Sequence, residues 1–204
     1  MNRFQPFVLL WLLSTCVFCA AQEASSKGAV SERASREFSG HDYAAAERDF
    51  RELTRVDPSS VAAYAFLGHA LFRQQKYAEA IRPYERAREL EQSGSKLSET
   101  DHRVLMDQLV MAYGLGGQLN RVYKLLDEAI KQDPEYPMNY YNLACAYAED
   151  NEKSKMLANL SSAFQHNEHM LKGEQIPDPR ADSSFQKYVM DPDFVRLMNK
   201  LGYK

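Results

Sequence analysis

Residues 61–94 decide the fold; they read VAAYAFLGHALFRQQKYAEAIRPYERARELEQSG. The residue types in this stretch return elsewhere in the chain at a spacing of 34 residues. Tyr43 and Tyr77 are 34 apart, and so are Ala46 and Ala80. A fixed period of this length indicates a repeat architecture, in which each unit buries its apolar face against its neighbours.

Four copies of the period cover about 70% of the chain: residues 27–60, 61–94, 103–136 and 137–170. Similar residue types recur at most of the same positions, with large residues at positions 4, 7, 11 and 24 and mostly small ones at 8, 20 and 27, although Val122 and Met156 stand at position 20 in the third and fourth copies. In the second copy these positions are Tyr64, Leu67, Gly68, Leu71, Ala80, Tyr84 and Ala87. The first copy departs from the pattern, because Arg33 stands where Leu is expected.

This pattern resembles the tetratricopeptide repeat. The resemblance implies an all-α fold without a sheet: a right-handed superhelix of antiparallel helix pairs, in which small residues let the two backbones of a pair approach closely. Eight extra residues before the third copy are expected to lengthen its first helix, with Ser98 or Thr100 as the N-cap.

Residues 171–204 follow the fourth copy and are expected to form a C-terminal cap on the solenoid. Two similar units occur there, Asp182-Ser-Ser-Phe185 and Asp191-Pro-Asp-Phe194. Each predicts a short N-capped helix with its aromatic turned inward. Such a tail resembles the end of many bacterial tetratricopeptide proteins, and repeat arrays need a cap to stay soluble.

The first 21 residues have the pattern of a secretory signal peptide, followed by a linker over residues 22–26. Arg3 is the positive residue, an apolar stretch begins at Phe7, and Cys19-Ala20-Ala21 predicts cleavage before Gln22. Export to the periplasm or secretion is therefore expected. Two alternatives stay open: an uncleaved anchor, and a lipoprotein acylated at Cys16, since Leu13-Ser-Thr-Cys16 is similar to a lipobox.

Charge and motifs exclude several function classes. The net charge is -3, and loss of Arg3 with the leader brings the mature chain near -4, without the basic stripe that nucleic acid requires. Cys145 is the sole cysteine after the leader, so no internal disulfide is expected. No nucleophile–base pair or phosphate loop stands out, and His166 with His169 supplies too few metal ligands. We therefore predict no enzyme activity and no cofactor.

The expected partner is another protein or a peptide segment, held in a concave groove. The resemblance implies that positions 2, 5, 9, 12 and 13 of each first helix line that groove. The candidates are Ala65, His69, Phe72 and Arg73 in the second copy, Asp107 and Met111 in the third, and Tyr141 and Cys145 in the fourth.

These side chains are mostly apolar, which suits an extended or helical segment with apolar anchors. Three alternatives stay open. Some of these side chains could only pack against the next repeat or the tail; the chain could associate with itself; and a lipidated or anchored form could be a structural component of an envelope assembly.

Overall fold

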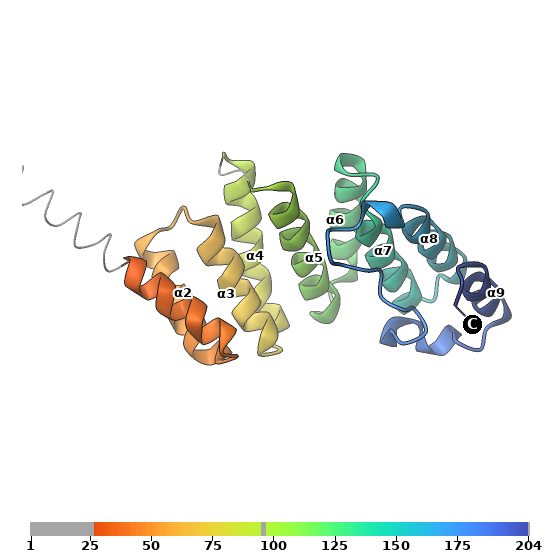
Figure 1. The fold of residues 1–204 in the computed structure, drawn as a ribbon, viewed down its shortest axis with the longest axis horizontal. Coiled ribbons are helices and arrows are strands. Elements are labelled where there is room, and N and C mark those ends of the chain that lie inside the picture. The colour runs from red at the N-terminus through yellow and green to blue at the C-terminus, as the bar shows by residue number, and fades with distance from the viewer. Residues whose placement is uncertain (1–26, 95–96, 204) are drawn as a thin grey trace, which may run out of the picture.

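The computed structural model describes residues 27–94 and 97–203, and this part of the chain contains helices and no strand. The expectations about the leader, the linker and Cys16 lie outside the described residues. Helices stand side by side in one elongated row (Figure 1). The all-α solenoid that the resemblance implies is therefore confirmed for the described residues.

The helices form four antiparallel pairs that follow the four sequence copies. The first helix of each pair spans residues 27–39, α3 (Val61–Arg73), α5 (Glu99–Leu115) and α7 (Pro137–Glu149). The second helices are α2 (Tyr43–Val56), α4 (Tyr77–Gln92), α6 (Leu119–Gln132) and α8 (Lys153–Gln165). None of the described helices is both long enough and apolar enough to span a membrane.

The turn inside each pair is the same in all four copies. Position 15 of each copy has a left-handed backbone: His41 (φ 64°), Gln75 (φ 61°), Gly117 (φ 74°) and Asn151 (φ 61°). This conformation favours glycine and tolerates asparagine. A turn with the same left-handed residue therefore joins the two helices of every pair.

The insertion before the third copy lengthens α5 to 17 residues, against 13 for α3 and α7. Ser98 caps the longer helix, because its side chain accepts a hydrogen bond from the Asp101 N–H. The expectation that the insertion lengthens this helix is confirmed, since the helix begins at Glu99, before the third copy starts.

Arg33, the departure in the first copy, has a polar partner in place of an apolar one. Its guanidinium makes two hydrogen bonds to Asp49 on α2, of which Nη2 to Oδ1 is 2.7 Å long. Asp49 is one of two buried polar residues of the described chain. An ion pair therefore joins the helices where the other copies use a leucine.

The apolar core is divided into two clusters, and the boundary runs through α7. Leu143 and Ala146 on α7 belong to the cluster that extends through the first three pairs. Tyr141, Ala144 and Ala148 on the same helix belong to a second cluster, which the fourth pair shares with the tail. The tail thus completes the second core rather than adding to a finished one.

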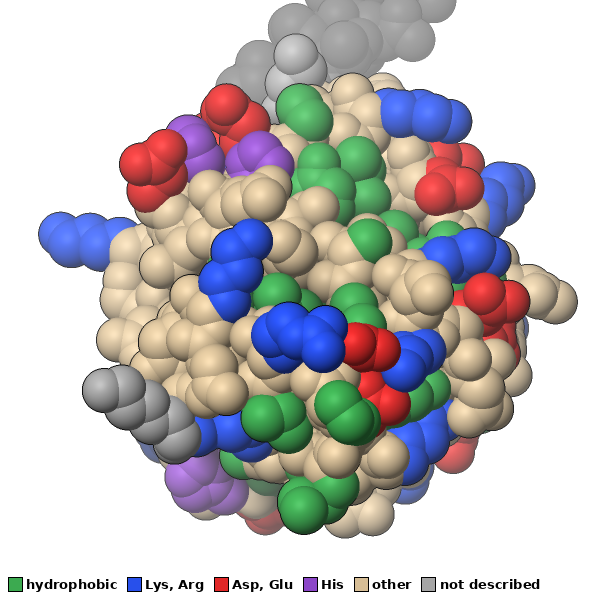
Figure 2. Space-filling view, turned by 90° about the vertical axis from the view of Figure 1, so that its right-hand side faces the viewer, with side chains coloured by type: hydrophobic (Ala, Val, Ile, Leu, Met, Phe, Trp, Pro, Cys, Tyr) green, Lys and Arg blue, Asp and Glu red, His purple; other side chains and the backbone are tan. Residues whose placement is uncertain are grey.

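The tail contains two short 3-10 helices, η1 (Asn167–His169) and η2 (Ser183–Tyr188), and one α-helix, α9 (Pro192–Lys200). The expected N-caps are present at Asp182 and Asp191. Phe185 and Phe194 are fully buried, with ring centroids 6.1 Å apart. On the surface at this end of the molecule, apolar side chains are interspersed with charged ones (Figure 2).

Candidate partner-binding groove

The first helices of successive pairs form the inner side of the solenoid. α3 packs against α5, and α5 packs against α7, in addition to the contacts each makes with its own pair. Side chains that these three helices turn away from the core therefore share one continuous surface. The predicted partner-binding residues all lie on these helices.

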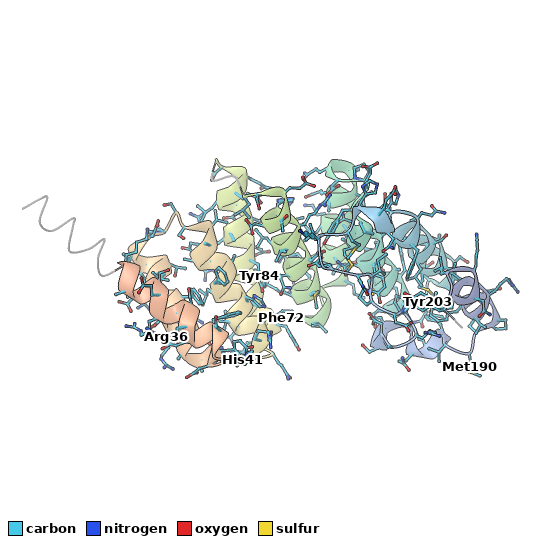
Figure 3. All side chains as sticks on the ribbon, viewed as in Figure 1. Arg36, His41, Phe72, Tyr84, Met190 and Tyr203 are labelled. Atoms are coloured by element: carbon cyan, nitrogen blue, oxygen red, sulfur yellow. The ribbon has the colours of Figure 1, made fainter. Side chains whose placement is uncertain are left out.

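The part of this surface on α3 and α5 is open. Met111 is 42% exposed, Leu115 is 56% exposed and Val104 is 40% exposed, which is high for large apolar side chains. Ala65 and Phe72 on α3 are half-buried at the edge of the first core cluster. Figure 3 shows Phe72 near the end of its helix. The predicted apolar surface is thus present here and accessible.

His69 and Arg73 add polar groups to the α3 side. The His69 ring packs against Phe38, with centroids 4.8 Å apart. Burial lowers the pKa of His69, with a smaller contribution from the Arg73 charge, so the imidazole is neutral at pH 7. The Arg73 guanidinium lies over the ring of Tyr43, 4.8 Å from its centroid, and is exposed.

Asp107 has a different environment, because other groups of the chain already bind its carboxylate. The hydroxyl of Tyr136 donates to Oδ2 at 2.6 Å, and the Asn142 amide donates to Oδ1 at 3.1 Å. Burial raises the pKa of Asp107 to about 7, and the nearby Glu174 charge adds to the rise. This carboxyl joins α5 to the start of α7. No pattern in the sequence indicated that Tyr136 and Asn142 would be the hydrogen-bond donors to Asp107.

Tyr141 and Cys145 lie beneath the tail. Tyr141 is 2% exposed; its hydroxyl donates to Asp182 Oδ2 at 2.8 Å, and its ring contacts Phe185 edge-on. Cys145 belongs to the same cluster, and burial raises the pKa of its thiol. For these two residues, the structure shows the packing alternative that the sequence left open.

The structure therefore divides the eight predicted residues into two sets. Five lie on the open surface of α3 and α5, which we call the open groove: Ala65, His69, Phe72, Arg73 and Met111. Asp107, Tyr141 and Cys145 instead contact other parts of the chain. Val104 and Leu115, at the groove positions 2 and 13 of the third copy, also lie on the open groove.

Titratable groups outside the groove do not gather into a metal site in the described part of the chain. His166 stacks on the ring of Tyr140, with centroids 5.3 Å apart, and His169 lies 3.9 Å from a carboxylate oxygen of Glu135. Both histidines thus have aromatic or acidic neighbours at the end of the fourth pair.

Comparison with known proteins agrees with this architecture. The family model described as "Tetratricopeptide repeat" matches residues 32–94, which include the whole second copy. Residues 32–94 therefore match the tetratricopeptide-repeat family, and the same helix-pair fold continues through the other described copies.

Solved structures share its fold along most of the chain. The MamA fragment 41-end from Desulfovibrio magneticus RS-1 is 16% identical, covers 86% of this chain and 93% of its own, and superposes with a TM-score of 0.63. YrrB is described as a tetratricopeptide-repeat protein with an unusual peptide-binding site; it is 14% identical, with coverages of 82% and 80% and a TM-score of 0.56.

BtubC from P. vanneervenii is 17% identical, covers 93% of this chain and 80% of its own, and has a TM-score of 0.60. At these identities the likeness concerns the fold alone. No curated protein matches this sequence.

Proposed function

We propose that the protein is a non-enzymatic interaction scaffold that holds a segment of another protein in the open groove. The observation that carries the proposal is the exposure of Met111 and Leu115 on α5, together with the half-buried Phe72 on the neighbouring helix α3. Apolar side chains that remain exposed together on a soluble surface mark interaction sites. YrrB, which shares the fold, has a peptide-binding site according to its description.

The chemistry of the open groove favours one kind of segment. Its floor is apolar, and Met111 is flexible enough to adapt to different side chains. Arg73 is the exposed charge at the end of α3, whereas His69 is neutral and Asp107 already has hydrogen-bond donors. A segment with two or three apolar anchors and an acidic group near Arg73 therefore fits this surface.

In-cell photo-crosslinking of the full-length protein tests this proposal. A crosslinkable residue replaces Met111 in the open groove or, as the matched control, Lys124, which is exposed on α6. We expect one dominant partner to be captured at residue 111, and Phe72→Ala to reduce that capture. Equal capture at residue 124, or links only between copies of this chain, would overturn the proposal in favour of an assembly component.

We also propose that this scaffold is exported, either to the periplasm or to the medium. The support is the signal-like pattern of residues 1–21. The intact mass of the purified protein distinguishes the alternatives. A mature chain that begins at Gln22 agrees with a free exported scaffold. A mass increased by acyl chains at Cys16 would instead indicate a membrane-tethered structural component.

A further inference from the structure

The tail attaches to the fourth helix pair through two units that use the same arrangement of groups. In the first unit, Asp182 Oδ1 accepts from the Ser184 N–H at 2.9 Å, while Oδ2 accepts from the Tyr141 hydroxyl on α7. One carboxylate therefore caps its own short helix and binds the body of the protein at once.

The second unit repeats this arrangement on the neighbouring helix. Asp191 Oδ1 accepts from the Asp193 N–H at 2.9 Å, and Oδ2 accepts from the Lys153 ammonium of α8 at 3.0 Å. Three residues after each aspartate comes a fully buried phenylalanine, Phe185 or Phe194. The pattern Asp-x-x-Phe thus attaches the tail to the fourth pair at two places, through Tyr141 on α7 and Lys153 on α8.

The segment before the first unit joins the second core cluster through its side chains, since Ile176 belongs to that cluster together with Tyr141 and Ala144 of α7. Ile176 and Pro179 are buried, whereas Glu174, Gln175 and Pro177 are exposed. Backbone hydrogen bonds in this stretch join it to itself: Glu174 to Leu171, Ala181 to Asp178 and Phe185 to Asp182. Contacts of this type can be reproduced by another chain that offers the same side chains.

We propose that the inner face of α7 is a binding site for segments that carry a carboxylate three residues before an aromatic ring, and that residues 176–185 of the protein's own tail occupy it as a competing intramolecular ligand. The Tyr141 hydroxyl donates a hydrogen bond to the carboxylate, and the aromatic ring packs against the apolar surface formed by Tyr141, Ala144 and Cys145. A partner with this pattern displaces the tail. This site lies on α7, whereas the open groove lies on α3 and α5, so either proposal can fail without the other.

The occupied state lowers the apparent affinity for any outside segment, because a partner can bind only the fraction of molecules whose tail has left. Weakening the tail should therefore strengthen binding in trans. Cys145 provides a second readout, since its thiol packs in the cluster that the tail completes. Alkylation of this cysteine reports release of the tail.

The experiment uses the full-length protein and a synthetic peptide with the sequence of residues 174–189. Fluorescence anisotropy measures peptide binding to the wild type, to Phe185→Ala and to the control Met190→Ala, whose side chain is 88% exposed on the same segment (Figure 3). We expect Phe185→Ala to bind at least about tenfold more tightly than the other two, as the release of a competing state predicts. A peptide that carries alanine in place of Asp182 and Phe185 should not bind.

Mass spectrometry of the Cys145 peptide measures alkylation in parallel. We expect faster alkylation in Phe185→Ala than in the wild type, and saturating peptide should slow it again. If Phe185→Ala does not fold, Asp182→Ala replaces it, because this change also weakens the tail and leaves the Tyr141 donor free. No gain in binding by a folded tail variant, or equal binding of the alanine-substituted peptide, would overturn the proposal.

Discussion

Gly68 on α3 lies directly against the ring of Tyr84 on α4, so closely that a Cβ atom at residue 68 would be 2.7 Å from two ring carbons. Tyr84 is fully buried (Figure 3), and burial raises the pKa of its hydroxyl. The ring cannot move aside without opening the core of the second pair. This contact fixes how closely the two helices approach.

Replacement of Gly68 by alanine should therefore destabilise the protein, although alanine favours helix formation. We expect the overpacking to lower the free energy of unfolding by about 1–3 kcal/mol. Urea denaturation followed by circular dichroism measures the change. Gly114→Ala is the matched control, because this glycine also lies inside a helix but has nothing within 4 Å of the added Cβ.

The control should gain up to about 1 kcal/mol from the better helix propensity of alanine. If Gly68→Ala were as stable as the wild type, the close approach of α3 and α4 would not be needed for the fold.

The left-handed turn at Gln75 predicts a stabilising substitution. An L-residue with a side chain is strained at φ 61°, and the exposed Gln75 side chain has no packing to lose. We expect Gln75→Gly to raise the free energy of unfolding by about 0.5–1 kcal/mol, after the entropy that glycine gains in the unfolded chain is subtracted. Thermal unfolding measures the effect.

Gln75→Val is the opposing variant, because a β-branched residue is an outlier at this backbone conformation. It should lower the stability. If the valine and glycine variants unfolded at the same temperature, the turn would not impose the left-handed conformation in solution.

Sequence reasoning predicted the solenoid well because most of the apolar positions that pack the helices recur at the same period. It interpreted Arg33 less well. The residue departs from the pattern, yet the pair with Asp49 makes it part of the packing. A one-dimensional pattern cannot show such a pair, because its partner also looks like an ordinary polar residue of an exposed helix face.

We therefore expect Arg33→Leu, which restores the family pattern, to destabilise the protein. The change leaves the buried Asp49 carboxylate without its guanidinium, which holds the pKa of that carboxyl below its ordinary value. The temperature of unfolding should fall. Arg36→Leu, on the exposed side of the same helix (Figure 3), is the control and should leave it nearly unchanged. An increase in Arg33→Leu would show that the family leucine is preferred here as well.

The candidate site was predictable only where the period continues. The open groove on α3 and α5 follows from positions that every first helix shares. The cover over Tyr141 and Cys145 does not, because the tail is not periodic. Its two Asp-x-x-Phe units were visible in the sequence, but the helix that each one contacts depends on the path of residues 171–182, which contain no helix to orient them.

The raised pKa of Asp107 predicts how the stability of the protein depends on pH. Its pKa is about 7 in the folded protein, chiefly because of burial, and the ordinary value is 3.8. Glu174 raises this pKa further, whereas the hydrogen bonds from Tyr136 and Asn142 and the charge of Arg103 lower it. The folded state therefore binds the proton more tightly than the unfolded state does.

A group with a raised acidic pKa stabilises the fold most when it is protonated. Its contribution is complete below about pH 4 and is lost as pH rises toward about 7, since the unfolded chain releases the proton first. Asp107→Asn removes this titration and keeps an oxygen that can accept from Tyr136. The wild type should lose stability between pH 4.5 and pH 8 that the variant keeps. The difference in unfolding free energy between the two should therefore shift in favour of the variant by about 1 kcal/mol or more, because each unit of pKa corresponds to about 1.4 kcal/mol.

Urea unfolding at both pH values tests this prediction, with Asp127→Asn on the exposed side of α6 as the control. The control should follow the wild type at both pH values. Parallel behaviour of Asp107→Asn and the wild type would mean that the carboxyl is ionised in the folded protein at both pH values. The junction between α5 and α7 would then hold a charged Asp107 between Tyr136 and Asn142, and burial would not be what sets its proton affinity.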